Sequence, residues 1–185
     1  MPKPVRLFIG IFVGVLTATI VRSCLGGGVS VKDLQKHTVA GITAEFPGTP
    51  QPLKVDVPPE VKSKVLLMDS YQTQTRTFLA AVSRVVYAPG IEANLDGALD
   101  GSVSNVMTTQ QMVKVSEQRE AATVSGLPGK RFSVVFRKGS DEFEMQGVIA
   151  TKGNAMWNGF AFFKKSDAKA REVAQRFVSS VTFTP

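Results

Sequence analysis

Three carboxylates of this chain are spaced so that they could work as acids and bases. Asp96 and Asp100 are four residues apart in a segment with helical spacing, which places both on one face of a helix. Glu117 follows in the next segment of the chain. Two carboxyl groups in one cleft can divide general-acid and general-base roles. The spacing is therefore compatible with a carboxylate-dependent hydrolase, but a solvated helix face is the expected interpretation.

A basic pair and two aromatic residues are the other candidates for contact with a ligand. Lys130 and Arg131, in the segment "GLPGKRF", either hold an anion or belong to a turn that leads into a strand. Trp157 and Phe163 share one face of "AMWNGFAFF", a segment that is apolar on both faces. Such a strand lies under helices or borders a pocket, so these residues are either core or contacts to a ligand or partner.

The residue types of the chain leave little other chemistry. It contains one cysteine, Cys24, and one histidine, His37, so a serine-hydrolase triad and a clustered zinc site are not expected. We expect no cofactor and no metal. The net charge is +7, but Lys3, Arg6 and Arg22 contribute three of its 22 basic residues before Cys24. Nucleic acid is not an expected partner, because strand alternation separates the basic side chains from the aromatic ones around Arg131.

The elements that must position these residues alternate between strand and helix patterns. Asn94 is a suitable N-cap for the first helix, and Ser166 begins the second. The strands before Asn94 and between the helices are bounded by glycine and proline, which predicts an antiparallel arrangement. We therefore expect an α+β fold, an antiparallel β-sheet flanked by helices. Strands are expected at 39–47, 53–59, 64–74, 76–90, 131–138, 142–150 and 155–163, and helices at 94–107 and 166–181.

The N-terminal segment has the layout of an export signal. Residues 1–6 carry two positive side chains, and the run from Leu7 to Val21 is strongly apolar. As a helix this run would rise about 22 Å, which is short of a hydrocarbon core of about 30 Å. The segment predicts export and contact with a membrane, without deciding between a cleaved signal and an anchor.

The end of this segment resembles the lipobox of bacterial lipoproteins. Val21, Ser23 and Cys24 occupy its aliphatic, small and cysteine positions, while Arg22 departs from it. The resemblance implies lipid attachment at Cys24. An uncleaved anchor and cleavage elsewhere remain the alternatives, and all three place the protein at a membrane on the extracytoplasmic side, periplasmic or cell-surface. We divide the chain into a signal or anchor (1–23), a flexible tether (24–37) and a globular domain (38–185).

Three short motifs resemble those of PsbP-like domains, in the same order. They are "EFPGTPQ" at 45–51, "GLPGKRF" at 126–132 and "RFVSSVTF" at 176–183. This family includes the PsbP subunit of photosystem II and bacterial DcrB-type lipoproteins. The resemblance covers residues 39–185 and implies an α-β-α sandwich built on an antiparallel sheet. It also implies a binding or assembly role, since members are mostly not enzymes.

Together these features predict a membrane-tethered, non-enzymatic module. We expect it to bind an envelope protein or a small apolar ligand, with a carboxylate-dependent envelope hydrolase as the alternative. The two hypotheses differ in the environment they require of Asp96, Asp100 and Glu117. A hydrolase requires two of these acids to come together in a cleft, and the sequence gives no sign of such a grouping. A structure without a cleft that holds two or more convergent ionisable groups would favour the binding module.

Overall fold

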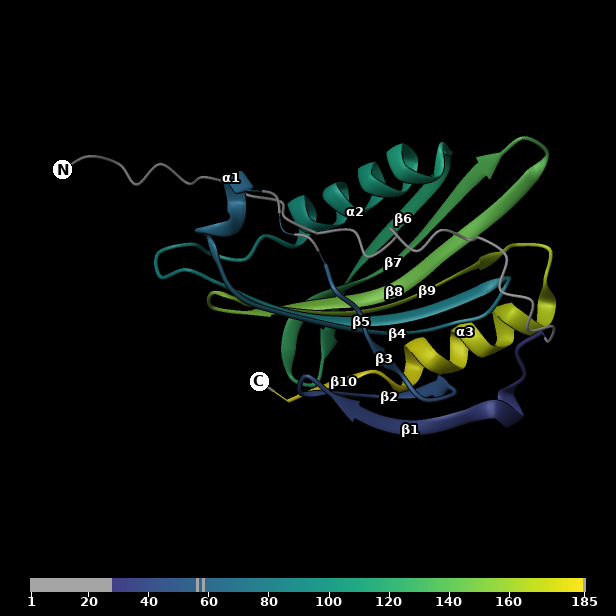
Figure 1. Ribbon diagram of the computed structural model, residues 1–185, viewed down its shortest axis with the longest axis horizontal. Coiled ribbons are helices and arrows are strands. Elements are labelled where there is room, and N and C mark those ends of the chain that lie inside the picture. The colour runs from purple at the N-terminus through teal and green to yellow at the C-terminus, as the bar shows by residue number, and fades with distance from the viewer. Residues whose placement is uncertain (1–27, 56, 58, 185) are drawn as a thin grey trace.

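Two antiparallel sheets dominate the molecule (Figure 1). The computed structural model describes residues 28–55, 57 and 59–184. The smaller sheet has the order β1 (Leu34–Val39), β2 (Ile42–Pro47) and β10 (Thr182–Phe183). The larger sheet has the order β3 (Gln51–Pro52), β4 (Val65–Gln74), β5 (Phe78–Tyr87), β9 (Ala155–Lys164), β8 (Asp141–Lys152), β7 (Leu127–Lys138) and β6 (Val113–Val124).

Four helical segments connect or cover these strands. A 3₁₀ turn, η1 (Val31–Asp33), precedes β1, and the short α1 (Pro59–Lys62) precedes β4. The two longer helices are α2 (Leu95–Gln110), between β5 and β6, and α3 (Ala168–Ser180), between β9 and β10. They lie on opposite faces of the large sheet (Figure 1).

Two glycine turns make the consecutive strands β7, β8 and β9 a meander. Gly139 and Gly153 both have φ of 60°, the left-handed region that glycine adopts without steric cost. In the turn between β7 and β8, Lys138 and Asp141 are the last pair of residues opposite each other. Because the side-chain period of a strand is two, this register sends alternate residues of each strand to opposite faces of the sheet.

The upper core, as Figure 1 is oriented, lies between α2 and the large sheet. The Asn94 side chain begins α2 by accepting hydrogen bonds from the backbone N–H groups of Asp96 and Gly97. Leu99 and Val106 point from the helix into this core. Their sheet neighbours include the fully buried Phe136, Met145, Ile149, Met156 and Phe160.

The lower core lies beneath the opposite face of the large sheet and is covered by α3 together with the small sheet (Figure 1). Phe177 of α3 and Phe46 of β2 meet edge to face with their ring centroids 5.1 Å apart. β2 also contacts β5 of the large sheet. The small sheet therefore packs into the core and is an integral part of the fold.

The expected fold class, an α+β sandwich of α-β-α type, is wrong. The molecule is mostly antiparallel β-structure in two sheets. The lower face of the large sheet is covered partly by strands, because β2 carries Ile42, Ala44 and Phe46 inward in strict alternation. The prediction counted the strand at 39–47 as part of one sheet, whereas a second sheet covers the same core as α3.

Individual elements agree with the sequence patterns more closely than the fold class does. The two longer helices, β4, β5 and the meander lie where they were expected. The expected strand at 53–59 is wrong, because β3 ends at Pro52, the described residues 53–55 and 57 are not in a strand, and α1 begins at Pro59. The tether expected at 24–37 overlaps η1 and most of β1, and β6 was not expected at all.

Candidate functional site

A charged cluster at the edge of the large sheet contains all three candidate carboxylates. Arg119 of β6 reaches towards α2 and binds Asp100 at 2.6 Å and Asp96 at 3.3 Å. The same guanidinium donates through Nε to Glu117 at 2.6 Å. Lys114 and Lys130 bind Glu117 and Asp96 respectively, each at 2.6 Å. We call these six residues the Arg119 cluster.

The electrostatics of the Arg119 cluster favour the ionised forms of Asp96 and Glu117. Hydrogen bonds from Lys130 and Arg119 lower the pKa of Asp96 below its ordinary value. At Glu117, partial burial acts to raise the pKa, but hydrogen bonds from Lys114 and Arg119 outweigh burial and lower the pKa. A general acid needs a raised pKa at neutral pH. The cluster brings the predicted carboxylates together, but as acceptors around a cation rather than as a proton-sharing pair.

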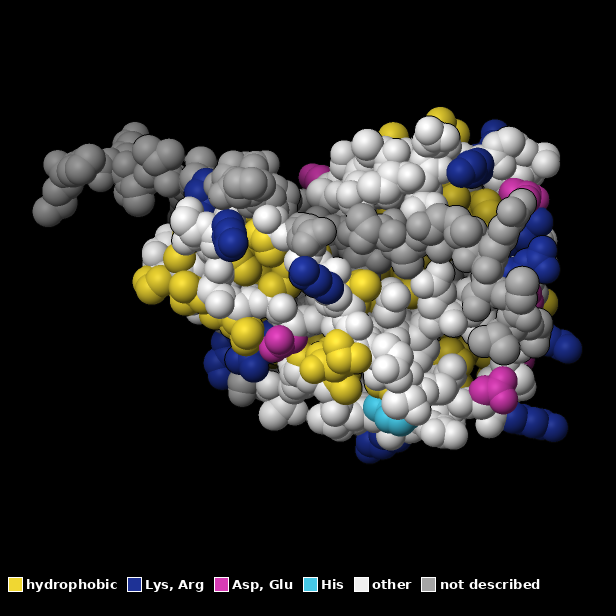
Figure 2. All heavy atoms as spheres, viewed as in Figure 1, with side chains coloured by type: hydrophobic (Ala, Val, Ile, Leu, Met, Phe, Trp, Pro, Cys, Tyr) yellow, Lys and Arg dark blue, Asp and Glu magenta, His cyan; other side chains and the backbone are white. Residues whose placement is uncertain are grey.

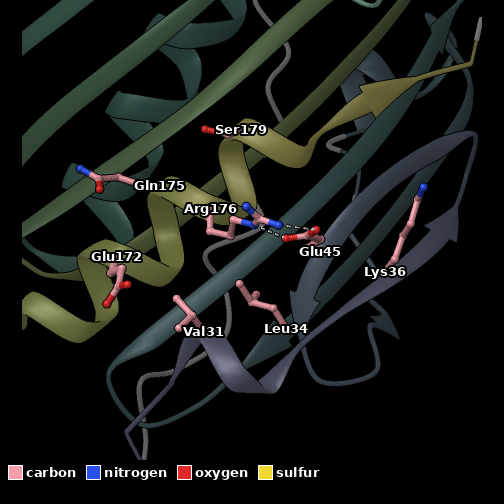
Figure 3. Close-up of a pocket in the computed structure, with 8 residues that line it drawn as sticks. All are labelled: Val31, Leu34, Lys36, Glu45, Glu172, Gln175, Arg176 and Ser179. Atoms are coloured by element: carbon pink, nitrogen blue, oxygen red, sulfur yellow. Dashed lines mark hydrogen bonds and ion pairs between the residues drawn. The ribbon is translucent and has the colours of Figure 1, made fainter.

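An open groove lies between α3 and the first elements of the described chain (Figure 3). Its volume is about 630 Å³. One wall comes from α3, and the other comes from η1, β1 and β2. We call it the α3 groove, and its lining residues are Val31, Leu34, Lys36, Glu45, Glu172, Gln175, Arg176 and Ser179.

A bidentate ion pair joins the two walls of the α3 groove. Arg176 donates from Nε and Nη2 to the two carboxylate oxygens of Glu45, at 2.6 and 3.2 Å (Figure 3). The hydrogen bonds to Glu45 raise the pKa of Arg176. The backbone N–H of Glu45 also donates to the hydroxyl oxygen of Ser180 on α3, at 2.8 Å. Lys36 and Glu172 form no ion pair within the described residues. Both are exposed, so the groove offers a charge of each sign.

The end of the molecule where α3 begins is rich in cations. Figure 2 shows Lys and Arg side chains gathered there, at the right of the view. Lys164 binds Asp141 and Lys165 binds Glu142, both at 2.8 Å. Lys169 is exposed and has no ion pair among the described residues. Much of this positive charge is therefore matched locally.

The predicted aromatic contacts are inside the protein. Trp157 is 2% exposed and Phe163 is 0% exposed, and both belong to the lower core. Trp157 packs on Phe183, with ring centroids 6.5 Å apart, and the Arg84 guanidinium lies 5.8 Å from its ring centroid. α3 and the small sheet cover the face of β9 that carries Trp157 and Phe163, so neither side chain is accessible to a ligand or partner.

The two residues of the predicted anion contact have different environments. Lys130 is committed to Asp96 in the Arg119 cluster, whereas Arg131 points to the other face of β7 and is exposed. They are neighbours on a strand, so their side chains alternate between faces and cannot close on one anion. Cys24, the predicted lipid attachment, lies outside the described residues.

The α3 groove was not predicted from the sequence. Its residues come from η1, β1, β2 and α3, which are separated by more than a hundred residues of chain. One wall fell within the expected tether, 24–37, so its side chains were not considered for a site. The alternation of Glu45 with buried Ala44 and Phe46 was a usable signal, because it places the carboxylate on the outer face of β2.

The described residues, 28–55, 57 and 59–184, hold neither a candidate metal site nor a helix that could cross a membrane. They contain no group of three His, Cys, Asp or Glu residues that could hold a metal ion. Over the same residues, every helix is too short or too polar to cross a bilayer. His37, on β1, packs edge to face against Phe46 at 6.2 Å between ring centroids.

Comparisons with known proteins assign no family to the chain. No family model and no curated protein matches it, so the PsbP-like resemblance is not confirmed. Solved structures match the chain only distantly, as three of them show. PA94, a Pseudomonas aeruginosa protein of unknown function, is 9% identical with a TM-score of 0.37, and the match covers 77% of this chain and 90% of that one.

The other two structures are equally distant. A Bacteroides thetaiotaomicron protein is 9% identical with a TM-score of 0.38, and the match covers 79% of this chain but only 46% of that one. LpqN of Mycobacterium tuberculosis, which is involved in cell envelope biogenesis, is 13% identical with a TM-score of 0.40. That match covers 86% of this chain and all of LpqN.

Proposed function

We propose that this chain is a non-enzymatic binding or assembly module, tethered to a membrane by its N-terminal segment, that docks an envelope protein in the α3 groove. The groove itself carries the proposal. It is open, it presents apolar side chains beside exposed charges of both signs, and it begins at Val31, close to the point where the tether enters the domain.

The composition of the α3 groove favours a protein over a small apolar ligand. Its apolar side chains, Val31 and Leu34, stand beside Lys36 and Glu172, and Val31 is 39% exposed. Apolar ligands are held in deep, mostly apolar pockets that bury most of their surface. A protein surface with complementary charges can contact all of these groups at once, because interface rims are polar and wet.

The Arg119 cluster supports a role without catalysis. The pKa values of Asp96 and Glu117 are lowered, so neither carboxyl group is suited to donate a proton near neutral pH. Arg119 also occupies the space between the carboxylates that a substrate would need. This arrangement gives the alternative, a carboxylate-dependent hydrolase, no support.

Site-specific photocross-linking tests the docking role. A photoreactive amino acid is placed at Gln175, an exposed groove position, and in a second strain at Thr109, an exposed position on α2. We expect one discrete protein to be cross-linked at Gln175 and not at Thr109, and Glu172→Lys to reduce its yield several-fold. Equal products at both positions, or none at Gln175, would contradict docking in the α3 groove.

The intact mass of the protein from a membrane fraction tests the tether. A species that starts at Cys24 and carries acyl groups identifies a lipoprotein, and Cys24→Ser then abolishes that modification. A membrane-bound chain of unmodified full-length mass identifies an uncleaved anchor. Recovery of the chain only from the fraction that does not sediment with membranes would contradict tethering in either form.

A further inference from the structure

The outer edge of β6 is the longest unpaired strand edge among the described residues. β6 runs from Val113 to Val124 at the end of the seven-stranded order and pairs only with β7. Its backbone N–H and C=O groups on the outer side are therefore available to another strand. The strand contains no proline, and most of its side chains are exposed. Such an edge is a template for pairing with a further strand.

We propose that β6 pairs antiparallel with β6 of a second copy of this chain, with Gln118 on the two-fold axis. In this register Glu117 of each copy lies opposite Arg119 of the other, which gives two cross-strand pairs of opposite charge. Moving the axis to Glu117 or to Arg119 would place two like charges opposite each other. The charge order of the strand therefore favours self-pairing in this register over the two adjacent ones.

The apolar side chains at the start of β6 fit the same register. Val113 is 60% exposed and Val115 is 43% exposed, an unusual degree for residues of a strand. With Gln118 on the axis, Val115 lies beside Ala121 of the second copy. The bulge between Lys114 and Ser116 ends the regular ladder at Val115, so Val113 lies beyond the paired stretch. Pairing is thereby limited to one stretch of the edge.

The elements around β6 leave room for a second copy. A two-fold axis perpendicular to the sheet keeps both α2 helices on one face, over β6, β7 and β8 of their own copies. The two β7 strands would be three strand spacings apart, about 14 Å. Helices pack at about 8–10 Å, so the α2 helices do not collide. Charged side chains of the two Arg119 clusters would occupy the space between them.

The same symmetry suits a chain that is held at one membrane. η1 packs on α3, and α3 covers the face of the large sheet opposite to α2 (Figure 1). A two-fold axis perpendicular to the sheet places both α3 helices, and both points where the N-terminal segments enter, on the same face of the joined sheet. The self-pairing is independent of the proposed docking role and does not require it.

Disulfide trapping of the full-length chain in membranes tests the register. Gln118→Cys puts two cysteines opposite each other at the axis, where oxidation with copper phenanthroline can join them. Glu120→Cys, on the same strand and face, would lie opposite Ser116 and not opposite itself. We expect a covalent dimer as the main product of Gln118→Cys, and only the wild-type background from Glu120→Cys, since Cys24 sets that background.

A mixed experiment provides an independent check of the same geometry. Ser116→Cys and Glu120→Cys chains, produced together, should form a disulfide heterodimer that neither forms alone. All three substituted positions are exposed, and the Trp157 emission of each variant reports folding. Dimer from Glu120→Cys alone, or monomer from both Gln118→Cys and the mixed chains, would overturn the proposal.

Discussion

At the scale of single residues, Arg119 organises more charge than any other side chain in the described part of the chain. It joins two turns of α2 to β6 through Asp96, Asp100 and Glu117. Its own side chain is 20% exposed, so part of the desolvation cost of the guanidinium is offset only while these acceptors are in place. Its removal would leave three carboxylates close together without their shared cation.

We expect Arg119→Gln to lower the free energy of unfolding at pH 7 by about 1–2 kcal/mol. The folded-state pKa values of Asp96 and Glu117 are lowered, so their pairing stabilises the protein above the unfolded-state values of about 4 and is lost as the pH falls through the folded-state values. The difference between wild type and variant, measured by urea unfolding, should therefore shrink between pH 6 and pH 3.

Arg131→Gln is the matched control for this experiment. Arg131 lies on the neighbouring strand, is exposed and forms no ion pair among the described residues. Its replacement should change stability by less than about 0.5 kcal/mol at any pH. If the Arg119 and Arg131 variants lose the same stability, or if the loss at Arg119 does not depend on pH, the cluster does not stabilise the fold in the way argued.

Gly147 illustrates a residue-scale constraint of another kind. It lies in β8 between Phe132 of β7 and Phe160 of β9. A Cβ added here would meet the Gly159 carbonyl oxygen, the Phe160 Cβ at 2.7 Å and the Phe132 Cζ at 2.8 Å. The first two of these belong to or adjoin the backbone and cannot rotate away. The site therefore requires glycine for close approach, even though its φ is ordinary.

We expect Gly147→Ala to destabilise the protein by about 2–3 kcal/mol, because the added methyl group overpacks a sheet interior. Gly28→Ala should be nearly neutral, since no atom outside its chain neighbours lies within 4 Å of the added Cβ. Thermal unfolding of both variants, followed by circular dichroism, gives the comparison. A neutral Gly147→Ala would show that β8 and β9 shift apart easily at this point.

At the scale of elements, the sequence predicts best where burial imposes a period. The meander β7–β9 was predicted because one face of each strand is apolar, and α3 because Ala170, Val173, Ala174, Phe177 and Val181 form one stripe, all buried. β6 was missed because its edge position leaves most side chains exposed, so no alternation is imposed on it. β1 was missed for the same reason.

Interactions distant in sequence account for what could not be predicted of the candidate site. Asp96, Asp100 and Glu117 were named as candidates, but nothing in the sequence indicated that they lie together. The cation between them is Arg119, which belongs to a strand that was not predicted. The α3 groove depends on η1 packing against α3, a contact between opposite ends of the chain. Trp157 was assigned to the right strand, yet its burial depended on the small sheet and on α3.

The N-cap of α2 gives an element-scale prediction. Asn94 accepts from the N–H groups of Asp96 and Gly97 at 3.0 and 3.1 Å. Asn94→Ala should lower the free energy of unfolding by about 1 kcal/mol, because these N–H groups lose their acceptor at the start of the helix. Ser104→Ala, an exposed replacement within the same helix, should be neutral within about 0.5 kcal/mol. If urea unfolding shows that Asn94→Ala and Ser104→Ala lower the free energy of unfolding equally, the loss at Asn94 does not come from the cap.

At the scale of the whole molecule, one sheet serves two cores. Along β5, Leu79 and Ala81 face α2, while Ala80 and Val82 face α3 and the small sheet. β9 does the same with Phe160 and Phe162 on one side and Ala161 and Phe163 on the other. Because both cores are built on the same backbone segments, neither can lose its sheet face while the other keeps it.

This shared sheet predicts a single cooperative unfolding transition. Trp157, the only tryptophan, is 2% exposed and reports on the lower core, whereas far-UV circular dichroism reports on all strands and helices. The two signals should give coincident urea curves. Leu99→Ala, which opens a cavity in the upper core, should shift both midpoints equally, with a loss of about 2–5 kcal/mol, although Leu99 lies across the sheet from Trp157. If Leu99→Ala leaves the Trp157 transition unchanged, the lower core, with α3, the α3 groove and the small sheet, folds as a separate unit. The α3 groove could then unfold while β6 stays folded. In that case the α3 groove and the β6 edge would be independent in stability as well as in position.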